Sequence, residues 1–79
     1  MRPPKHARRL LQRLGAEIRH RREKRGDSQV QLAQKARVHL NVIGRTERGI
    51  YNSTVLTLKA IAAALGLSVA TLMRAAAKR

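Results

Sequence analysis

Residues 28–49, SQVQLAQKARVHLNVIGRTERG, predict two short helices joined by a tight turn. Ser28 is a favourable N-cap residue, and Gln31 stands three residues later, where it completes a capping box. Glycine commonly follows the last residue of a helix, and the segment ends on one. The expected elements are a helix over 29–36, a turn at Arg37-Val38-His39, a helix over 40–48 and a stop at Gly49.

The expected helix over 40–48 has two chemically different faces. Ile43, with Val38 of the turn, is expected to pack on Leu32 and Ala33 of the preceding helix. The opposite face carries side chains that bind bases or phosphates, namely Asn41, Arg45 and Arg48. A short helix followed by a tight turn and a second helix presents that second helix to the major groove of DNA.

An amphipathic helix is expected before this segment, over residues 7–25. Its apolar positions recur at three- and four-residue spacing: Leu10, Leu11, Leu14 and Ile18. Gly15 costs a helix about 1 kcal/mol relative to Ala, so another element is expected to pack closely at that position. Gly26 is a natural stop.

Two further helices are expected after Gly49. Thr54 or Ser53 caps a helix that extends to Leu65, and Ser68 caps a last helix from Val69 to about Ala76. The inner face of the first of these is expected to hold Val55, Leu58, Ile61, Ala62 and Leu65. No convincing strand alternation is present, so the predicted fold class is all-α, a five-helix bundle containing a helix-turn-helix. The predicted organisation is a flexible basic arm over 1–6 and one domain over 7–77.

Composition excludes several classes of protein. The 79 residues include no Cys and one aromatic residue, Tyr51, so disulfides and Cys-ligated metals are ruled out. The three His residues are scattered, and with the four acids they form no catalytic dyad or triad at recognisable spacing. No metal, cofactor or enzymatic activity is expected. The longest apolar run, Ala60–Leu65, is far below the roughly 20 residues of a membrane span.

A large excess of positive charge points to a polyanionic partner. Eighteen Lys and Arg stand against four Asp and Glu, a net charge of +14, of which +8 lies within residues 1–25. Nucleic acid is the first candidate and an anionic membrane surface the second. The basic N-terminal segment is either a solvated helix face or, through residues 2–9, an arm that reaches the DNA backbone or minor groove.

The order of several short motifs resembles the phage repressor/Cro-type (XRE-type) helix-turn-helix family over roughly residues 11–73. The matching fragments are Leu14-Gly15-x-x-Ile18-Arg19-x-x-Arg22, Ser28-Gln29-x-x-Leu32-Ala33, Glu47-Arg48-Gly49 and Leu58-x-x-Ile61-Ala62-x-x-Leu65-Gly66. Each fragment alone is weak evidence. In this order and at this spacing, they together indicate the lambda-repressor-like DNA-binding fold.

The resemblance implies roles for individual residues. Base edges would be read by Leu40, by Asn41 and by either Gly44 or Arg45. Phosphates would be bound by Gln29, Arg48, Asn52 and Ser53. Glu47 would pair with Arg22 and tie the recognition helix to the first helix. The chemistry of the side chains agrees, since Arg suits guanine and Asn suits adenine.

This sequence departs from the family pattern at five positions. Asp27 and Thr46 stand where aliphatic residues are usual, and Gly44 lowers the helix propensity of the recognition helix. Arg37 replaces the usual glycine of the turn, and a non-Gly residue at positive φ is uncommon. His39 replaces a Ser or Thr cap. The side chains of Arg37 and His39 are expected to contact phosphates, which the usual residues at these positions cannot do.

The leading hypothesis is a sequence-specific regulator of transcription that binds double-stranded DNA. It is expected to act as a repressor or autoregulator, as a homodimer on a palindromic operator, in the cytoplasm on the nucleoid. The final helix and the C-terminal tail are the expected dimer surface. An antitoxin with an unidentified toxin partner, or a restriction–modification controller, are alternatives of the same class. A nonspecific nucleoid or RNA-binding protein and a membrane-surface basic helical protein are alternatives of other classes.

Overall fold

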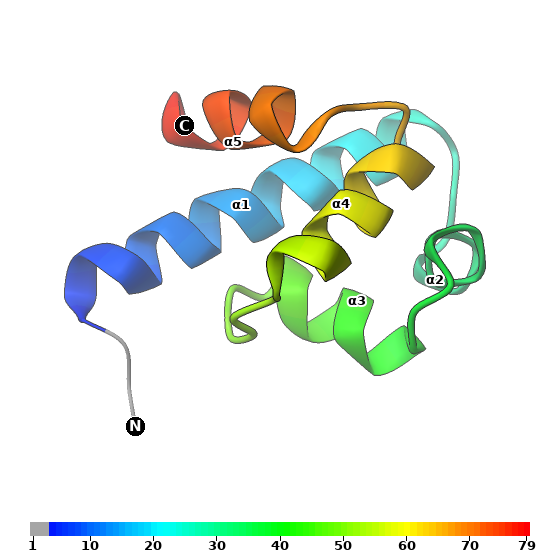
Figure 1. Cartoon of the computed structure of the whole chain (residues 1–79), viewed down its shortest axis with the longest axis horizontal. Coiled ribbons are helices and arrows are strands. Elements are labelled where there is room, and N and C mark those ends of the chain that lie inside the picture. Colours follow the sequence, from blue (N-terminus) through cyan, green and yellow to red (C-terminus); the bar gives the residue numbers. More distant parts are fainter. Residues whose placement is uncertain (1–3) are drawn as a thin grey trace.

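Five helices make up the fold in the computed structural model, which describes residues 4–79 (Figure 1). They are α1 (Lys5–Lys24), α2 (Gln29–Ala36), α3 (Leu40–Glu47), α4 (Val55–Ala64) and α5 (Val69–Ala77). Helix α5 lies along α1, α3 packs on α1 and α2, and α4 contacts α2 and α5. The all-α fold class and the helix-turn-helix are therefore confirmed.

The first helix begins earlier than expected. Residues 1–3 of the expected arm lie outside the described residues, and Lys5 and His6 belong to α1 rather than to an arm. Pro4 explains the difference. Its φ of −55° and ψ of 156° place it at the N-cap, and its carbonyl accepts the hydrogen bond of the Arg8 amide at 3.0 Å. A proline excludes helix before it but not after it.

The remaining boundaries lie close to the expected ones. Helix α3 ends at Glu47, one residue early, because Arg48 is its C-cap, and α1 ends at Lys24 before Gly26, whose φ is +77°. Thr54, not Ser53, caps α4 by accepting the amide of Thr57. Differences of one residue are common at frayed helix ends.

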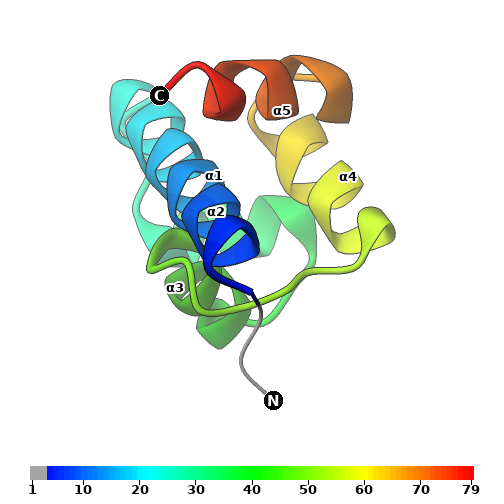
Figure 2. The ribbon, with the colours of Figure 1, turned by 90° about the vertical axis from the view of Figure 1, so that its left-hand side faces the viewer.

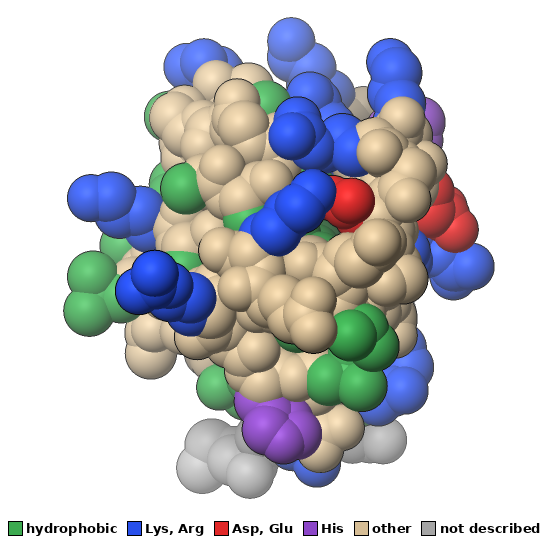
Figure 3. All heavy atoms as spheres, turned by 90° about the vertical axis from the view of Figure 1, so that its right-hand side faces the viewer, with side chains coloured by type: hydrophobic (Ala, Val, Ile, Leu, Met, Phe, Trp, Pro, Cys, Tyr) green, Lys and Arg blue, Asp and Glu red, His purple; other side chains and the backbone are tan. Residues whose placement is uncertain are grey.

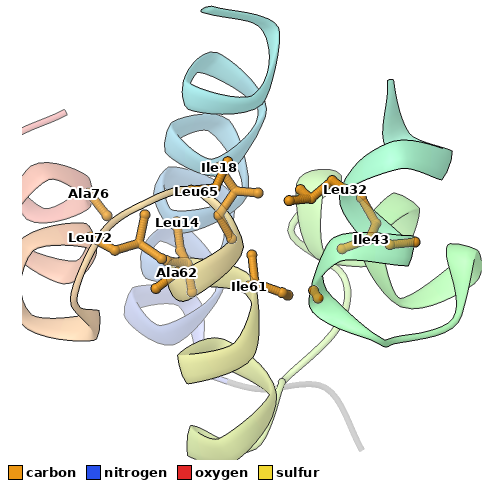
Figure 4. Packing of buried hydrophobic residues seen from close by; sticks show 11 residues of the cluster. Leu14, Ile18, Leu32, Ile43, Ile61, Ala62, Leu65, Leu72 and Ala76 are labelled. Carbon is orange, nitrogen blue, oxygen red and sulfur yellow. The ribbon is translucent and has the colours of Figure 1, made fainter. Parts of the chain in front are cut away.

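Side chains from all five helices build one core. In Figure 4 the side chains of α1 and α4 stand between those of α5 on one side and those of α2 and α3 on the other. The members with no exposure at all include one large aliphatic from each helix: Ile18, Leu32, Ile43, Ile61 and Leu72. Leu72 is therefore a core residue, and Met73 packs partly buried against the same cluster.

Val55 was expected in the core and is instead 72% exposed. It is the first residue of α4, a helix whose neighbours are α2 and α5 and whose buried residues, Ile61 and Ala62, stand in its second half. Leu56 beside it is also exposed.

Among residues 4–79, no single helix has the length and apolar content to cross a membrane. Helices α4 and α5 reach that combination only as a pair bent by 92°.

A buried carboxylate fastens the end of the chain to α1. Glu17 accepts hydrogen bonds from Arg21 at 2.7 Å and from Arg79 at 2.9 Å. These bonds, that of Arg21 foremost, hold the pKa of Glu17 below its usual range, although burial opposes them.

The lowered pKa of Glu17 makes part of the stability depend on pH. A carboxyl with a lowered folded-state pKa contributes stability that is complete above its unfolded pKa of about 4.3 and is lost as the pH falls through the folded value. The Glu17→Gln variant is expected to lose less unfolding free energy between pH 5 and pH 3 than the wild type, as measured by urea unfolding. Glu23→Gln, on the exposed side of α1, is the control. An equal decline in wild type and Glu17→Gln would contradict the expectation.

Candidate nucleic-acid interface

The turn between α2 and α3 places a non-glycine residue in the left-handed conformation, which is sterically unfavourable for a residue with a side chain. Arg37 has φ 57° and ψ 41°, the left-handed region, and is the only described non-Gly residue with positive φ. Its amide donates to the Gln34 carbonyl, and the Val38 amide donates to the Ala33 carbonyl at 3.0 Å. These bonds end α2 in the manner of a glycine C-cap, so the turn has its usual shape without the usual residue.

Replacing Arg37 by Gly is expected to change the stability of the fold and its affinity for DNA in opposite directions. Glycine has no steric penalty at positive φ, so the free energy of unfolding is expected to rise by about 1 kcal/mol. If the exposed Arg37 side chain contacts a phosphate, DNA affinity falls in the same variant. Urea unfolding and a DNA titration on one preparation measure both. A loss of stability would show that the arginine is held by contacts that outweigh the strain of its backbone.

The beginning of α3 is capped by an imidazole. His39 Nδ1 accepts the backbone amide of Asn41 at 3.1 Å. An acceptor Nδ1 places the proton of the neutral ring on Nε2. At the beginning of α2, Ser28 and Gln31 form the expected reciprocal capping box, with bonds of 3.0 and 2.7 Å. Both helices of the motif thus begin at a defined residue.

The outward face of α3 is polar and accessible. Ile43 and Thr46 are buried on its inner side. The Thr46 hydroxyl donates to the Val42 carbonyl at 2.6 Å, so this departure from an aliphatic residue leaves no buried polar group without a partner. The exposed residues of the other side are Leu40, Asn41, Arg45 and Arg48. Gly44 is half-buried, beside the side chain of Gln29.

A buried ion pair fixes the far end of α3. Arg22 of α1 donates two hydrogen bonds to Glu47, at 2.7 and 3.0 Å, and the two side chains are 10% and 3% exposed. The expected pair is therefore present, in the strong two-point geometry. Arg22 also donates to the Asp27 carbonyl at 2.9 Å. The carboxylate of Glu47 raises the pKa of Arg22 above its usual value.

Gln29 takes part in the same network, which the sequence did not indicate. Its Nε2 donates to Glu47 Oε1 at 3.0 Å, and the side chain is half-buried. The amide keeps one further N–H, and the backbone N–H of Gln29 lies in the first turn of α2, where amides have no partner within the helix. Glu47 thereby connects α1, the beginning of α2 and the end of α3.

The connection after α3 contains the other two residues that are expected to contact the DNA backbone. Asn52 is exposed, whereas Ser53 is half-buried, with its hydroxyl 3.3 Å from that of Thr46. Asp27, the acidic residue that departs from the family pattern before α2, pairs with Lys35 at 2.8 Å.

Seen from the side of α2, Lys and Arg side chains project in several directions and acidic side chains occupy little of the surface (Figure 3). Within residues 4–79, no three His, Asp or Glu side chains are grouped as metal ligands.

Comparison with known proteins identifies this arrangement. The chain is 38% identical over 60 residues to the immunity repressor protein of Bacillus phage phi105, a match that spans 76% of this chain and 42% of that repressor. The chain thus covers less than half the length of this relative.

Solved structures of regulators superpose on most of the chain. The clp gene regulator ClgR of Corynebacterium glutamicum matches 87% of this chain and 73% of its own, with a TM-score of 0.82 at 33% identity. The restriction–modification controller protein C.AhdI of Aeromonas hydrophila matches 78% of this chain and 94% of its own, with a TM-score of 0.76 at 29% identity. The family model HTH_3, described as helix-turn-helix, matches residues 18–72. The chain therefore belongs to the HTH_3 helix-turn-helix family of DNA-binding transcription regulators.

Proposed function

We propose that this protein is a sequence-specific repressor or autoregulator that binds a palindromic DNA operator as a homodimer. The observation that carries the proposal is the pairing of an accessible polar face on α3 with a buried anchor, Arg22–Glu47–Gln29, at its far end. A recognition helix must be held rigidly if its side chains are to distinguish bases. The resemblance to a phage immunity repressor supports repression in particular.

The side chains of the interface divide into readers of bases and binders of phosphates. Arg45 is assigned to a guanine and Asn41 to an adenine, with Leu40 against a thymine methyl. Gly44 has no side chain to read with, so Arg45 takes the second reading position. The assigned phosphate contacts are Gln29, Arg37, His39, Arg48, Asn52 and, with its hydroxyl partly engaged, Ser53.

A second copy is needed because one recognition helix reads few base pairs. Half-sites one helical turn apart are separated by about 34 Å, and the described domain measures 31 × 25 × 20 Å. Two domains side by side on one face of DNA therefore suit that spacing.

We assign the contact between the two copies to the connection after α3 and the first turn of α4. Ile50, Val55 and Leu56 are 66%, 72% and 79% exposed, whereas the large apolar residues of α5 are not among the exposed ones. The expected dimer surface on α5 is thus less suitable, because α5 uses its apolar face against α1 and α4. Leu56→Lys is expected to weaken pairing on DNA, and Val30→Lys on α2 is the control. Sedimentation of protein–DNA complexes would contradict the assignment if both variants pair as the wild type does.

The proposed function is tested by selection from random double-stranded DNA. The protein is mixed with the pool at moderate salt, and the bound fraction is sequenced after several rounds. An enriched palindrome is the expected result. Strong binding that enriches no sequence would overturn the proposal and favour a nonspecific nucleoid protein.

The resemblance to a restriction–modification controller gives a second candidate of the same class. Such a protein would bind DNA with the same residues, so the selected sequence distinguishes the two roles only through its genomic position. A site upstream of the protein's own gene fits autoregulation. A site upstream of an adjacent restriction enzyme gene fits the controller.

A further inference from the structure

The first half of α1 carries positive charge without any acid to neutralise it. Lys5, Arg8, Arg9 and Arg13 are all exposed, and the first acid of the chain is Glu17. Within residues 4–79, none of these four cations forms an ion pair. The second half of α1 differs, because Arg19, Arg21 and Arg22 each bind a carboxylate. Uncompensated cations that gather at one end of a helix are available for an external anion.

Two glycines place this end of α1 against the interface. A Cβ at Gly15 would overlap the Thr46 carbonyl oxygen at the end of α3, and a Cβ at Gly49 would lie 2.7 Å from Gln12 Cα. Residues 12–15 of α1 therefore contact the end of the recognition helix and the residue that follows it. At a rise of about 1.5 Å per residue, Arg8 lies about 6 Å and Lys5 about 10 Å beyond Gln12 along the axis.

Two perpendicular views agree on the direction in which this end points. In Figures 1 and 2 the N-terminal end of α1, the connection between α3 and α4, and α3 itself lie toward the lower side of the molecule, and α5 lies on the upper side. Helix α5, with Arg74 and its C-cap residue Lys78, thus lies on the side opposite α3, and Lys24, the last residue of α1, stands at the other end of that helix from Lys5.

Four exposed side chains of this end share one face of α1. Lys5, Arg8, Arg9 and Gln12 stand at helical spacing and together border a shallow, open hollow. Three of these four are cations, and the fourth offers amide donors, so this face presents donors for phosphate oxygens.

We propose that Lys5, Arg8 and Arg9, the N-terminal basic cluster, bind phosphates of the DNA backbone beside those bound by the residues that follow α3. This inference rests on the proposed function, since α3 must face DNA for the cluster to reach it. The cluster supplies affinity that depends on salt and is independent of sequence, whereas α3 supplies the discrimination.

The test compares two variants that lose the same charge. Lys5→Gln/Arg8→Gln/Arg9→Gln removes the cluster, and Lys24→Gln/Arg74→Gln/Lys78→Gln, the remote variant, removes three exposed cations that lie away from the cluster. The affinity of each for a selected duplex is titrated between 50 and 200 mM salt. Circular dichroism melts establish that both variants are folded.

The cluster variant is expected to lose about 2.7 from the slope of log affinity against log salt, for three phosphates. Over this fourfold range, the wild-type affinity would then fall about 40-fold more than that of the variant. The base preferences would stay the same. The remote variant is expected to keep most of the wild-type slope.

Equal slopes for the two variants would overturn the inference. So would a cluster variant that binds DNA with the wild-type slope but binds anionic phosphatidylserine vesicles less well, because the cluster would then serve a membrane surface. If the wild type selects no sequence at all, the proposed function fails. The slopes on a random duplex still decide whether the cluster contacts DNA.

Discussion

The Glu47→Ala variant is expected to lose about 3–5 kcal/mol of unfolding free energy. The substitution leaves the guanidinium of Arg22 buried without its carboxylate and removes the acceptor of the Gln29 amide. Small domains have a total stability of about 5–15 kcal/mol, so the variant is expected to be partly unfolded at physiological temperature. Urea unfolding followed by circular dichroism measures the loss.

The chain offers a matched control for this loss. Glu23 pairs with Arg19 on the exposed side of α1, at 3.4 Å and with both side chains more than half exposed. Glu23→Ala is expected to cost less than about 1 kcal/mol. The double variant Arg22→Met/Glu47→Leu is expected to recover much of the stability, since an apolar pair of similar volume can replace a buried ion pair. If Glu47→Ala and Glu23→Ala cost the same, the buried pair does not anchor α3.

The Gly15→Ala variant is expected to be destabilised by about 1–3 kcal/mol, although alanine favours a helix more than glycine does. The new methyl group would overlap the Thr46 carbonyl oxygen and lie 2.6 Å from that of Glu47. Backbone atoms cannot rotate aside, so α3 must move away from α1. Thermal unfolding measures the stability, and a DNA titration measures the consequence for α3, expected as weaker specific binding.

Gly44→Ala is the control, because it introduces the same methyl group at another helical glycine. At this position the nearest atom is Gln29 Oε1, 3.9 Å away. The variant is expected to gain up to about 1 kcal/mol from helix propensity alone. The two alanines thus have opposite signs. A gain of stability in both would show that α1 and α3 are not in close contact at Gly15.

Much of the fold was predictable because its signals are local. Side-chain caps fix the beginnings of α2, α4 and α5 through hydrogen bonds within a few residues, and Ser28 with Gln31 behaves as the sequence indicates. Glycines with positive φ follow α1, α3 and α4. Gly15 indicated a close approach, but only the structure shows that the partner is the end of α3. The pair of Arg22 with Glu47 was predictable through the family resemblance and not from spacing.

The features that were missed depend on tertiary packing. The periodicity of α4 places Val55 on the apolar face, but periodicity does not show where the neighbouring helices stop covering that face. The bond from Gln29 to Glu47 joins residues 18 positions apart, and no local pattern indicates it. The beginning of α1 at Lys5 follows from Pro4, because a proline prevents a helix from continuing before it but allows one to begin directly after it.

The central claim is that α3 reads bases through Arg45. Selection from random DNA, repeated with Arg45→Ala and with Arg48→Ala, tests it most directly. The claim predicts that Arg45→Ala relaxes the preference at one position of each half-site, by about 1–3 kcal/mol, while Arg48→Ala weakens binding to all sequences alike and keeps the preferences. If Arg45→Ala selects the same sequence as the wild type with undiminished preference at every position, the claim is contradicted.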